Sequence, residues 1–477
     1  MTPQAAFESL VRSAGIAPLA MPAFDGSEAL VPSPFRIATA MAAALGYAGA
    51  AAAEIWRFRG GDKQEVGVDL KAAAAMVVPE YKLNGTAVRP MLPPSAVTGF
   101  YQSVDGRWLH LNGGFPHLKL RTLDLLNAND TKASVMEAVS KWNALALEDA
   151  LGFLGLCGAM VRSENEWRSW IPGRLALTPI VLTNVAPGPP LRLADSAVPL
   201  GGLKVLDLTR AVAGPLCSRQ LAEHGAEVLS VAAGRLPSAG VLDDIYAAGK
   251  RQTNLDLIEP SAAEALRRLA RSADVFVDSY RPGALTALGF SPAALAHLAP
   301  GMISVSISAY GFEGPWAARR GFEETVEAAT GLASEQGAFM AARHGGANQP
   351  ELLPGAVLAT LTGVLGTVGV LAALLRRIRE GGSWHVEVSL AATAAWLSSL
   401  GRIDAAVVPE VFEPFTGLDQ YLQSCETKDG WFEFLGPVVR MAKTPPRGGS
   451  LPEGIVSPHW ASAHEEANAA ENKSAQT

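Results

Sequence analysis

Three turns in the middle of the chain combine turn-forming residues with cationic or polar side chains. They read TRAVAGP (209–215), SYRPG (279–283) and SAYGFEGPW (308–316). Lys250 and Arg251 lie in a fourth such segment, just before another apolar run. None of these segments matches the GxGxxG or GxxxxGK(S/T) phosphate loops. Because guanidinium and ammonium groups recognise phosphate oxygens, the cations in these turns indicate a phosphate-bearing ligand.

The pattern around these turns alternates short apolar runs with segments of helical periodicity. Strands that alternate with helices form a parallel, doubly wound sheet, and ligands bind outside the carboxyl ends of its strands. We therefore expect an α/β protein with a Rossmann-like sheet, in which the three turns meet at one edge. The sequence predicts strands at Lys204–Leu208, Val228–Val231, Asp274–Asp278 and Met302–Ile307, and helices near 216–224, 260–272 and 291–298.

The composition of the 477-residue chain excludes several classes of protein. Apolar residues make up 49% and charged residues 18%, so the chain can bury a large core. The net charge of −7 argues against nucleic acid and against an anionic membrane surface as partners. Cys157, Cys217 and Cys425 are too few and too scattered for a disulfide framework or a metal site. The first 15 residues lack the pattern of a signal peptide, so we expect a cytoplasmic protein.

One supersecondary unit occurs twice, at an offset of 320 residues. LGYAGAAAAEIWRFRGGDKQEVGVDLKAAAA, from Leu45, aligns without a gap with LGTVGVLAALLRRIREGGSWHVEVSLAATAA, from Leu365. Both copies predict an apolar helix of small residues, a basic turn, a glycine-containing turn, an alternating strand and a second helix. Further along each copy, a strand pair is predicted around Asp105-Gly106 and again around Asp429-Gly430.

The apolar stretch Leu352–Leu375 is long enough to span a bilayer. It contains Pro354 and four glycines, and no aromatic belt flanks it. The equivalent copy near the N-terminus has Lys and Asp around its strand, which suits a protein that does not enter the membrane. We therefore expect a buried core helix and no membrane association.

The chain divides into four parts. Residues 1–195 hold the first copy and an additional α/β region that ends in the Pro-rich linker APGPPLRLADSAVP. Residues 196–400 hold the strand–helix units and the second copy, and residues 401–450 hold a partial repeat element. Residues 451–477 end in a stretch without an apolar period, and we expect a disordered tail there.

Six motifs of the chain resemble the class III CoA-transferase family, which includes the formyl-CoA and carnitine CoA-transferases of the CaiB/BaiF type. The resemblance runs from Pro199 to about Ser399, with the motifs in the order in which the family has them. Residues 1–195 resemble the later half of the family, so the modules stand in a late-half, early-half order. The motifs are GGLKVLDLTRAVAGP, HGAEVL, GKRQTNLDL, ADVFVDSYRPGALTALGF, PGMISVSISAYGFEGPW and GFEETVEAATGL.

This resemblance implies a Rossmann-like CoA-binding domain that moves CoA between an acyl-CoA and a carboxylic acid. Coenzyme A or acyl-CoA would be the ligand or substrate, with no covalently bound cofactor and no metal. The family often forms interlocked dimers, so a homodimer or a pairing with a paralogue is implied. The positions that match the family's CoA contacts are Val212, Ala213, Gly214, Lys250, Arg251, Ser279, Tyr280, Arg281 and Arg320.

The family's nucleophile is an Asp that lies four residues before a glycine at the start of the apolar helix. It attacks the thioester, expels CoA thiolate and holds the acyl group as an anhydride. That glycine matches Gly363, which puts Ala359 at the nucleophile position. The first copy has Thr39 at the equivalent position. The related racemases use a His and an Asp, and the matching positions here are Phe322 and Ala359.

Glu323 is the nearest acid in the matching motif, and the sequence leaves two roles open for it. It could be a displaced nucleophile, or, with Glu324 and Glu327, it could stabilise the start of a helix. The leading hypothesis is a CoA-transferase that has lost the usual Asp. The alternative is a catalytically silent acyl-CoA-binding protein, or a subunit of an active paralogue. A nicotinamide-dependent oxidoreductase is disfavoured because no GxGxxG follows a strand.

Overall fold

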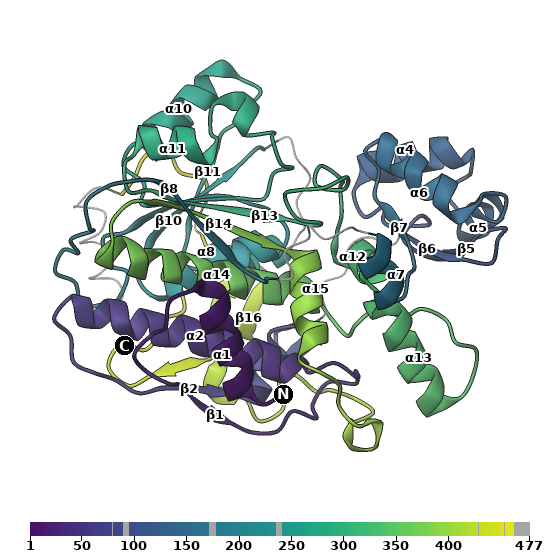
Figure 1. Ribbon diagram of the computed structural model, residues 1–477, viewed down its shortest axis with the longest axis horizontal. Coiled ribbons are helices and arrows are strands. Elements are labelled where there is room, and N and C mark those ends of the chain that lie inside the picture. The colour runs from purple at the N-terminus through teal and green to yellow at the C-terminus, as the bar shows by residue number, and fades with distance from the viewer. Residues whose placement is uncertain are drawn as a thin grey trace.

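The computed structural model describes residues 1–78, 80–88, 95–170, 178–234, 241–427, 429–452 and 454–461. A large α/β body contains a seven-stranded sheet with helices on both faces, and a smaller module lies at its side (Figure 1). The chain enters this smaller module at residue 95 and leaves it near residue 160.

The central sheet confirms the predicted fold class. Its strand order is β11-β10-β9-β12-β13-β14-β8, with all neighbours parallel except β8, which pairs antiparallel with β14. The four predicted strands are β9, β10, β12 and β13. The bounds are β8 (Val181–Ala186), β9 (Lys204–Leu208), β10 (Glu227–Ala232), β11 (Arg251–Asn254), β12 (Val275–Asp278), β13 (Ile303–Ser308) and β14 (Ser383–Ser389).

Alternate residues of β9, β10 and β12 face two different hydrophobic cores, because successive side chains of a strand point to opposite faces. In β9, Val205 belongs to the larger core under α8 (Ala213–Glu223) and α14 (Val357–Arg379). Its neighbour Leu206 belongs to the core under α10 (Pro260–Ala270) and α11 (Pro292–Leu298). All three helices predicted in this region are present, and α8 begins at Ala213, three residues earlier than predicted.

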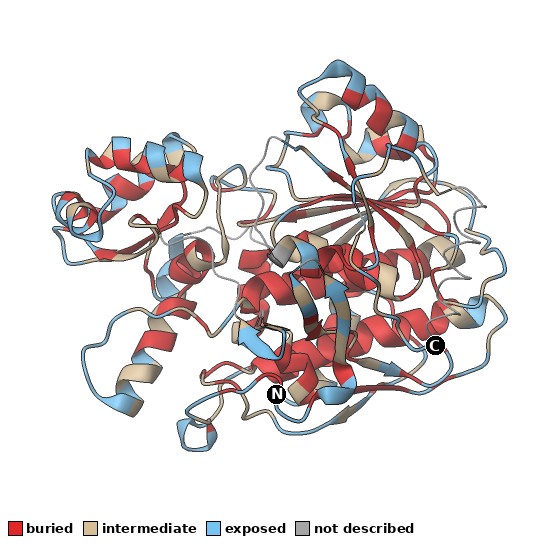
Figure 2. Cartoon of the chain, turned by 180° about the vertical axis from the view of Figure 1, so that it is seen from behind, coloured by how far each residue is buried: buried red, intermediate tan, exposed pale blue. Residues whose placement is uncertain are grey.

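Both repeated segments form a helix, a strand and a second helix. In the first segment these elements are α2 (Ile37–Phe58), β2 (Val66–Asp69) and α3 (Leu70–Ala75), and in the second they are α14, β14 and α15 (Leu390–Ser399). α2 and α14 pack against each other in the middle of the larger body, and both are buried along most of their length (Figure 2). They are the two described helices that are long and apolar enough to cross a membrane, and the apolar window of each is wholly buried, as expected for core helices.

Strands near the C-terminal end of the chain pair with strands of the N-terminal segment, far away in sequence. β17 (Val439–Met441) pairs with β2, which also pairs with β1 (Ala23–Asp25). β16 (Gly430–Leu435) pairs with β15 (Leu422–Thr427) and with β3. Residues 401–450 therefore belong to the same folded body as the N-terminal segment. The shorter elements there are α1 (Pro3–Ala14), β3 (Tyr81–Leu83) and β4 (Thr86–Val88).

The smaller module has its own core. Its side chains come from two strand pairings and three helices and include Leu109, Leu123 and Leu147. Its three-stranded sheet has the order β5-β6-β7. The elements are β5 (Gly99–Gln102), β6 (Trp108–Leu111), α4 (Pro116–Leu126), α5 (Lys132–Val139), α6 (Ala144–Phe153) and β7 (Gly158–Met160).

Residues 454–461, which we expected to lie in a disordered tail, run along the edge of the large sheet. The N–H of Val456 donates to the carbonyl of Gln252 at 2.7 Å, and Thr253 Oγ1 donates to the carbonyl of Val456 at 2.8 Å. Trp460 Nε1 donates to the carbonyl of Leu269 at 3.2 Å. These bonds cover the edge of β11, which would otherwise expose unpaired backbone groups. Residues 462–477 lie outside the described residues.

A close approach at Gly363 sets the distance between α14 and α8. A Cβ atom at this position would lie 2.5 Å from the carbonyl oxygen of Ala213 and 3.1 Å from Leu216 Cβ. We expect Gly363→Ala to lower the free energy of unfolding by about 1–3 kcal/mol, because overpacking outweighs the helix propensity that alanine gains. Urea unfolding followed by circular dichroism measures it.

Gly152→Ala is the matched control for this substitution. Gly152 is also helical, but its added Cβ would lie no closer than 3.2 Å to the Arg319 guanidinium, which needs to shift by only a few tenths of an ångström and can keep its bonds to the smaller module. This variant should be as stable as the parent or slightly more stable. Equal stability of the two variants would contradict the constraint at Gly363.

Candidate functional site

The turn after β9 is held in a tight, strained conformation. Ala211 has a φ of +66°, a left-handed backbone conformation that residues with a side chain rarely adopt. Val212 is the residue that caps α8, and Ala213 and Gly214 form the first turn of that helix. A Cβ on Gly214 would lie 2.2 Å from Thr209 Cβ, so only glycine fits there. The small residues let the start of α8 come close to the end of β9.

The turn after β12 lies beside it, because β9 and β12 are neighbours in the sheet. Asp278 ends β12, and its Oδ1 accepts the backbone N–H of Tyr280 at 3.2 Å. Its Oδ2 accepts a hydrogen bond from Ser306 on β13, at 3.0 Å. Ser279, Tyr280 and Arg281 are therefore fixed at the carboxyl edge of the sheet, and Arg281 is exposed there.

Arg320 joins the same edge from the segment between β13 and α12 (Glu323–Thr330). Partial burial lowers the pKa of Arg320, and the nearby charges of Arg281 and Arg121 lower it further. Arg210, in the turn after β9, is also exposed. Arg210 lies in the first of the turns singled out in the sequence, but it was not among the residues predicted to contact CoA. Its position directly after a predicted strand was the available signal. The structure thus brings the predicted Arg281 and Arg320 together.

Lys250 does not face this edge, which corrects its prediction as a phosphate contact. Its ammonium is buried and donates to Asp207 Oδ2 at 2.9 Å, to the carbonyl of Pro215 at 2.7 Å and to Ser218 Oγ at 2.7 Å. Burial lowers the pKa of Lys250, and the carboxylate of Asp207 opposes that shift. All three ammonium protons are used inside the protein, where they fasten α8 to β9.

Arg251 is also displaced from the predicted site. It begins β11, and its guanidinium lies 3.3 Å from Glu227 Oε1 at the amino-terminal start of β10. It also donates to the carbonyl of His459 at 3.2 Å. Because Glu227 lies at the opposite end of the parallel strands from the three turns, Arg251 stabilises the edge strand and the segment 454–461.

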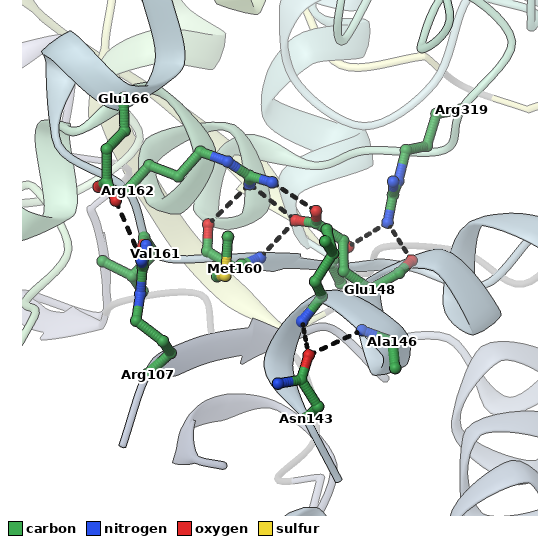
Figure 3. Close-up of polar contacts among 11 residues, drawn as sticks. Arg107, Asn143, Ala146, Glu148, Met160, Val161, Arg162, Glu166 and Arg319 are labelled. Atoms are coloured by element: carbon green, nitrogen blue, oxygen red, sulfur yellow. Dashed lines mark hydrogen bonds and ion pairs between the residues drawn. The ribbon is translucent and has the colours of Figure 1, made fainter. Parts of the chain in front are cut away.

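The segment that carries Arg320 is fastened to the smaller module by the neighbouring Arg319. Figure 3 shows its guanidinium bonded to the module: Nη2 donates to the carbonyl of Glu148 at 2.5 Å, and also to that of Gly158 at 3.2 Å. The Glu148 carboxylate in turn holds Arg162 through bonds of 2.8 and 2.5 Å, and both side chains are buried. The Arg319 guanidinium also lies over the ring of Trp316, 4.0 Å from its centroid. This network fixes where Arg320 can lie.

Glu323 reaches the start of α14, where the resemblance described above predicts a nucleophile. Its Oε1 accepts the N–H of Leu358 at 2.7 Å, and its Oε2 accepts the N–H of Ala359 at 3.3 Å. These are first-turn N–H groups of α14, which have no partner within the helix. A carboxyl group from α12 thus occupies the start of α14 beside Ala359, which carries no acid of its own.

The carboxyl group of Glu323 is protonated more readily than an ordinary glutamate. Burial, and then the neighbouring Glu324, raise the pKa of Glu323 well above its usual range. Glu327 lies one helical turn away and hydrogen-bonds Glu323, and burial, followed by the charge of Glu323, raises the pKa of Glu327. A hydrogen bond between two carboxyl groups requires that one of them carries a proton. Glu327 also accepts the N–H of Leu353 at 2.9 Å.

The groups that could bind phosphate and the acid that could attack a thioester lie in two different places. The exposed guanidinium groups at the carboxyl edge can bind phosphate oxygens. The carboxyl group at the start of α14 is the acid that could attack a thioester, but both of its oxygens accept backbone hydrogen bonds. In the described parts of the chain, no group of three or more metal-ligating side chains gathers.

Residues 200–437 match the sequence model of CoA-transferase family III. Acetyl-coenzyme A transferase nodX of Hypoxylon pulicicidum is 32% identical over 347 residues, which make up 67% of this chain and 58% of that protein. The chain belongs to CoA-transferase family III. A probable fatty acyl-CoA transferase of Mycobacterium tuberculosis is 32% identical over 219 residues, 43% of this chain and 54% of that protein.

Solved structures of family III proteins give a similar match. The crystal structure of the same Mycobacterium tuberculosis protein covers 43% of this chain and 58% of its own, with 32% identity and a TM-score of 0.38. A CaiB/BaiF family protein from Brucella suis covers 49% of this chain and 65% of its own, with 23% identity and a TM-score of 0.37. The chain spans somewhat more than half the length of the curated relatives named above.

A substitution of the buried Lys250 tests whether this side chain stabilises the fold or binds a phosphate. Lys250→Met leaves the Asp207 carboxylate buried without its partner, so the free energy of unfolding should fall by about 3–5 kcal/mol. Urea denaturation at pH 7 measures the change. Arg251→Met, on the next residue and in a more exposed ion pair, should cost about 1 kcal/mol or less. A stable Lys250→Met protein that has lost only CoA affinity would contradict the assignment.

Proposed function

We propose that this chain binds a CoA thioester at the carboxyl edge of the seven-stranded sheet and acts in CoA transfer between an acyl-CoA and a carboxylic acid. The observation that supports the proposal most strongly is the gathering of Arg281 and Arg320 at the carboxyl edge of the sheet. Like charges repel, so their convergence on one exposed edge favours an anionic ligand there. The phosphates of CoA match that charge, and membership of family III supports the same ligand class.

The small residues Val212, Ala213 and Gly214 have a defined part in this proposal. They bring the first turn of α8, whose N–H groups have no partner within the helix and no side-chain cap from Val212, next to the strained turn at Ala211. Backbone N–H groups at a helix start attract anions and allow a ligand to come close. A CoA moiety would therefore lie along this turn, with Arg281 and Arg320 on its phosphates.

CoA binding and acyl transfer depend on different residues of the chain. Because Ala359 has no carboxylate and both oxygens of Glu323 hold the start of α14, we expect acyl transfer by this chain to be absent or slow. In that case the chain serves as a CoA-binding protein, or as the binding subunit of an active paralogue.

A second candidate places Glu323 as the nucleophile, and one observation favours it. Its carboxyl group lies within hydrogen-bonding distance of the N–H of Ala359, next to the position of the missing Asp. In this reaction a Glu323 oxygen would bond to the thioester carbonyl carbon, and the carbon–sulfur bond would break to release CoA thiolate. The two N–H groups at the start of α14 would then stabilise the charge that develops on the acyl oxygen.

Ligand binding can be tested with two substitutions at the carboxyl edge. Arg281→Gln and Arg320→Gln should each weaken CoA binding roughly tenfold or more, the loss of one charge-assisted hydrogen bond. Isothermal titration calorimetry with CoA measures the dissociation constants. Arg268→Gln, on the exposed side of α10, is the matched control and should bind CoA like the parent. Unchanged affinity in both edge variants, with the fold intact, would overturn the site.

Acyl transfer can be tested by moving the carboxylate. Glu323→Gln alone should abolish the hydroxamate that forms above the protein-free background when the protein is incubated with acetyl-CoA and hydroxylamine, because hydroxylamine also cleaves acetyl-CoA directly. Glu323→Gln combined with Ala359→Asp places a carboxylate at the family's position without a neighbouring charge at residue 323, and should raise acyl-enzyme formation above the parent. Mass spectrometry of the protein and of the hydroxamate gives the readout. Brisk turnover that survives Glu323→Gln would contradict both roles considered for Glu323.

The same assay has a defined pH dependence. The carboxylate is the reactive form, and the pKa of Glu323 is raised, so its population increases as the pH rises across the neutral range. Any acyl-enzyme formed by Glu323 should therefore increase between pH 6 and pH 9. Glu323→Gln should lose this rise together with the acyl-enzyme, because its amide does not ionise.

A further inference from the structure

The start of α4, in the smaller module, lies directly against the loops of the candidate site. The ring of Phe115 packs against that of Phe322, two residues beyond Arg320, at a centroid distance of 5.6 Å. The guanidinium of Arg210, in the turn after β9, lies 5.9 Å from the centroid of Phe115. Residues that are distant in the sequence thus form one continuous surface across the boundary between the module and the sheet.

Two further groups of α4 extend the cationic edge. His117 stacks on Phe115 at a centroid distance of 6.1 Å and is exposed. Arg121 lies one helical turn further along α4, and its Nη2 donates to the carbonyl of Leu154 at 2.7 Å, which holds the exposed guanidinium in place. Partial burial lowers the pKa of His117, and so do the nearby charges of Arg320, Arg121 and Arg210.

The position of this surface indicates its chemistry. Four arginines from four separate segments, Arg121, Arg210, Arg281 and Arg320, surround the boundary, so the positive charge is shared between the module and the sheet. Planar guanidinium groups bind phosphate oxygens in pairs, and exposed aromatic faces stack with bases. The start of α4 also presents the positive end of an 11-residue helix. Together these groups fit a nucleotide phosphate.

We propose that His117 and Arg121, with the ring of Phe115, form a second half of the ligand site and bind a phosphate of the nucleotide end of CoA. This inference rests on the proposed function, which places the ligand against Arg281 and Arg320. The module is then a part of the binding site, and Arg319 is a positioning residue, since its bonds to Glu148 and Gly158 hold the two halves together.

The inference is tested on the full chain with Arg121→Gln and with Lys119→Gln as the matched control. Lys119 lies on the same helix, but its ammonium pairs with Asp130 at 2.7 Å. The probes are CoA, dephospho-CoA, which lacks the 3′-phosphate, and 4′-phosphopantetheine, which lacks the nucleotide. Calorimetry at low and moderate salt gives each dissociation constant, because exposed charge pairs weaken as salt is added.

Arg121→Gln should weaken CoA binding roughly tenfold and leave 4′-phosphopantetheine binding unchanged, and Lys119→Gln should change neither. If dephospho-CoA binds the parent and Arg121→Gln equally, Arg121 binds the 3′-phosphate, and if it also loses affinity, Arg121 binds the diphosphate. CoA affinity that is unchanged in Arg121→Gln but reduced in Arg281→Gln would overturn the second half-site alone. A parent protein that does not bind CoA would overturn the proposed function itself.

Discussion

The close contact between α14 and α8 at Gly363 is the constraint on which the candidate site depends. Without a side chain at Gly363, the carbonyl of Ala213 can lie against α14, and the first turn of α8 lies where the strained turn after β9 requires it. The buried ion pair of Lys250 and Asp207 fixes the same helix from its other side. The position of α8 beside the candidate site is therefore determined by close packing and by a buried ion pair before any ligand is considered.

The same packing explains why binding and catalysis can be separated in this chain. In the proposed function the cations that bind phosphate lie on turns at the carboxyl edge, whereas the resemblance to the family places the nucleophile at the start of α14. An alanine at position 359 would then change only the second of these places. Glu323 then caps α14, because its oxygens accept hydrogen bonds from two buried N–H groups that would otherwise be unpaired. A carboxyl group held in this way is a good cap and a poor nucleophile.

Much of the sheet could be predicted from sequence because its signals are local. The strands β9, β10, β12 and β13 are short apolar runs, and the helices between them have clear periodicity, so each was predicted within a few residues. The start of α8 was misplaced, since Gly214 and Pro215 read as a turn although glycine and proline are tolerated in the first turn of a helix. Packing of this first turn of α8 against Gly363 favours helix where the local sequence predicts a turn.

The candidate site was less predictable, for a different physical reason. A Lys or Arg beside a strand has the same local pattern whether it faces solvent or a buried acid, and only the register of the sheet decides which. Lys250 pairs with Asp207, 43 residues away in sequence, and Arg251 pairs with Glu227 at the amino-terminal end of the parallel strands. Arg121 presents the converse case. Its helix lies about 200 residues from Arg320 in sequence, and the two are brought together by the packing of Phe115 on Phe322 and by the bonds of Arg319 to the smaller module. A site assembled across two modules has no local signal, so its charge can be recognised only once the modules have been placed together.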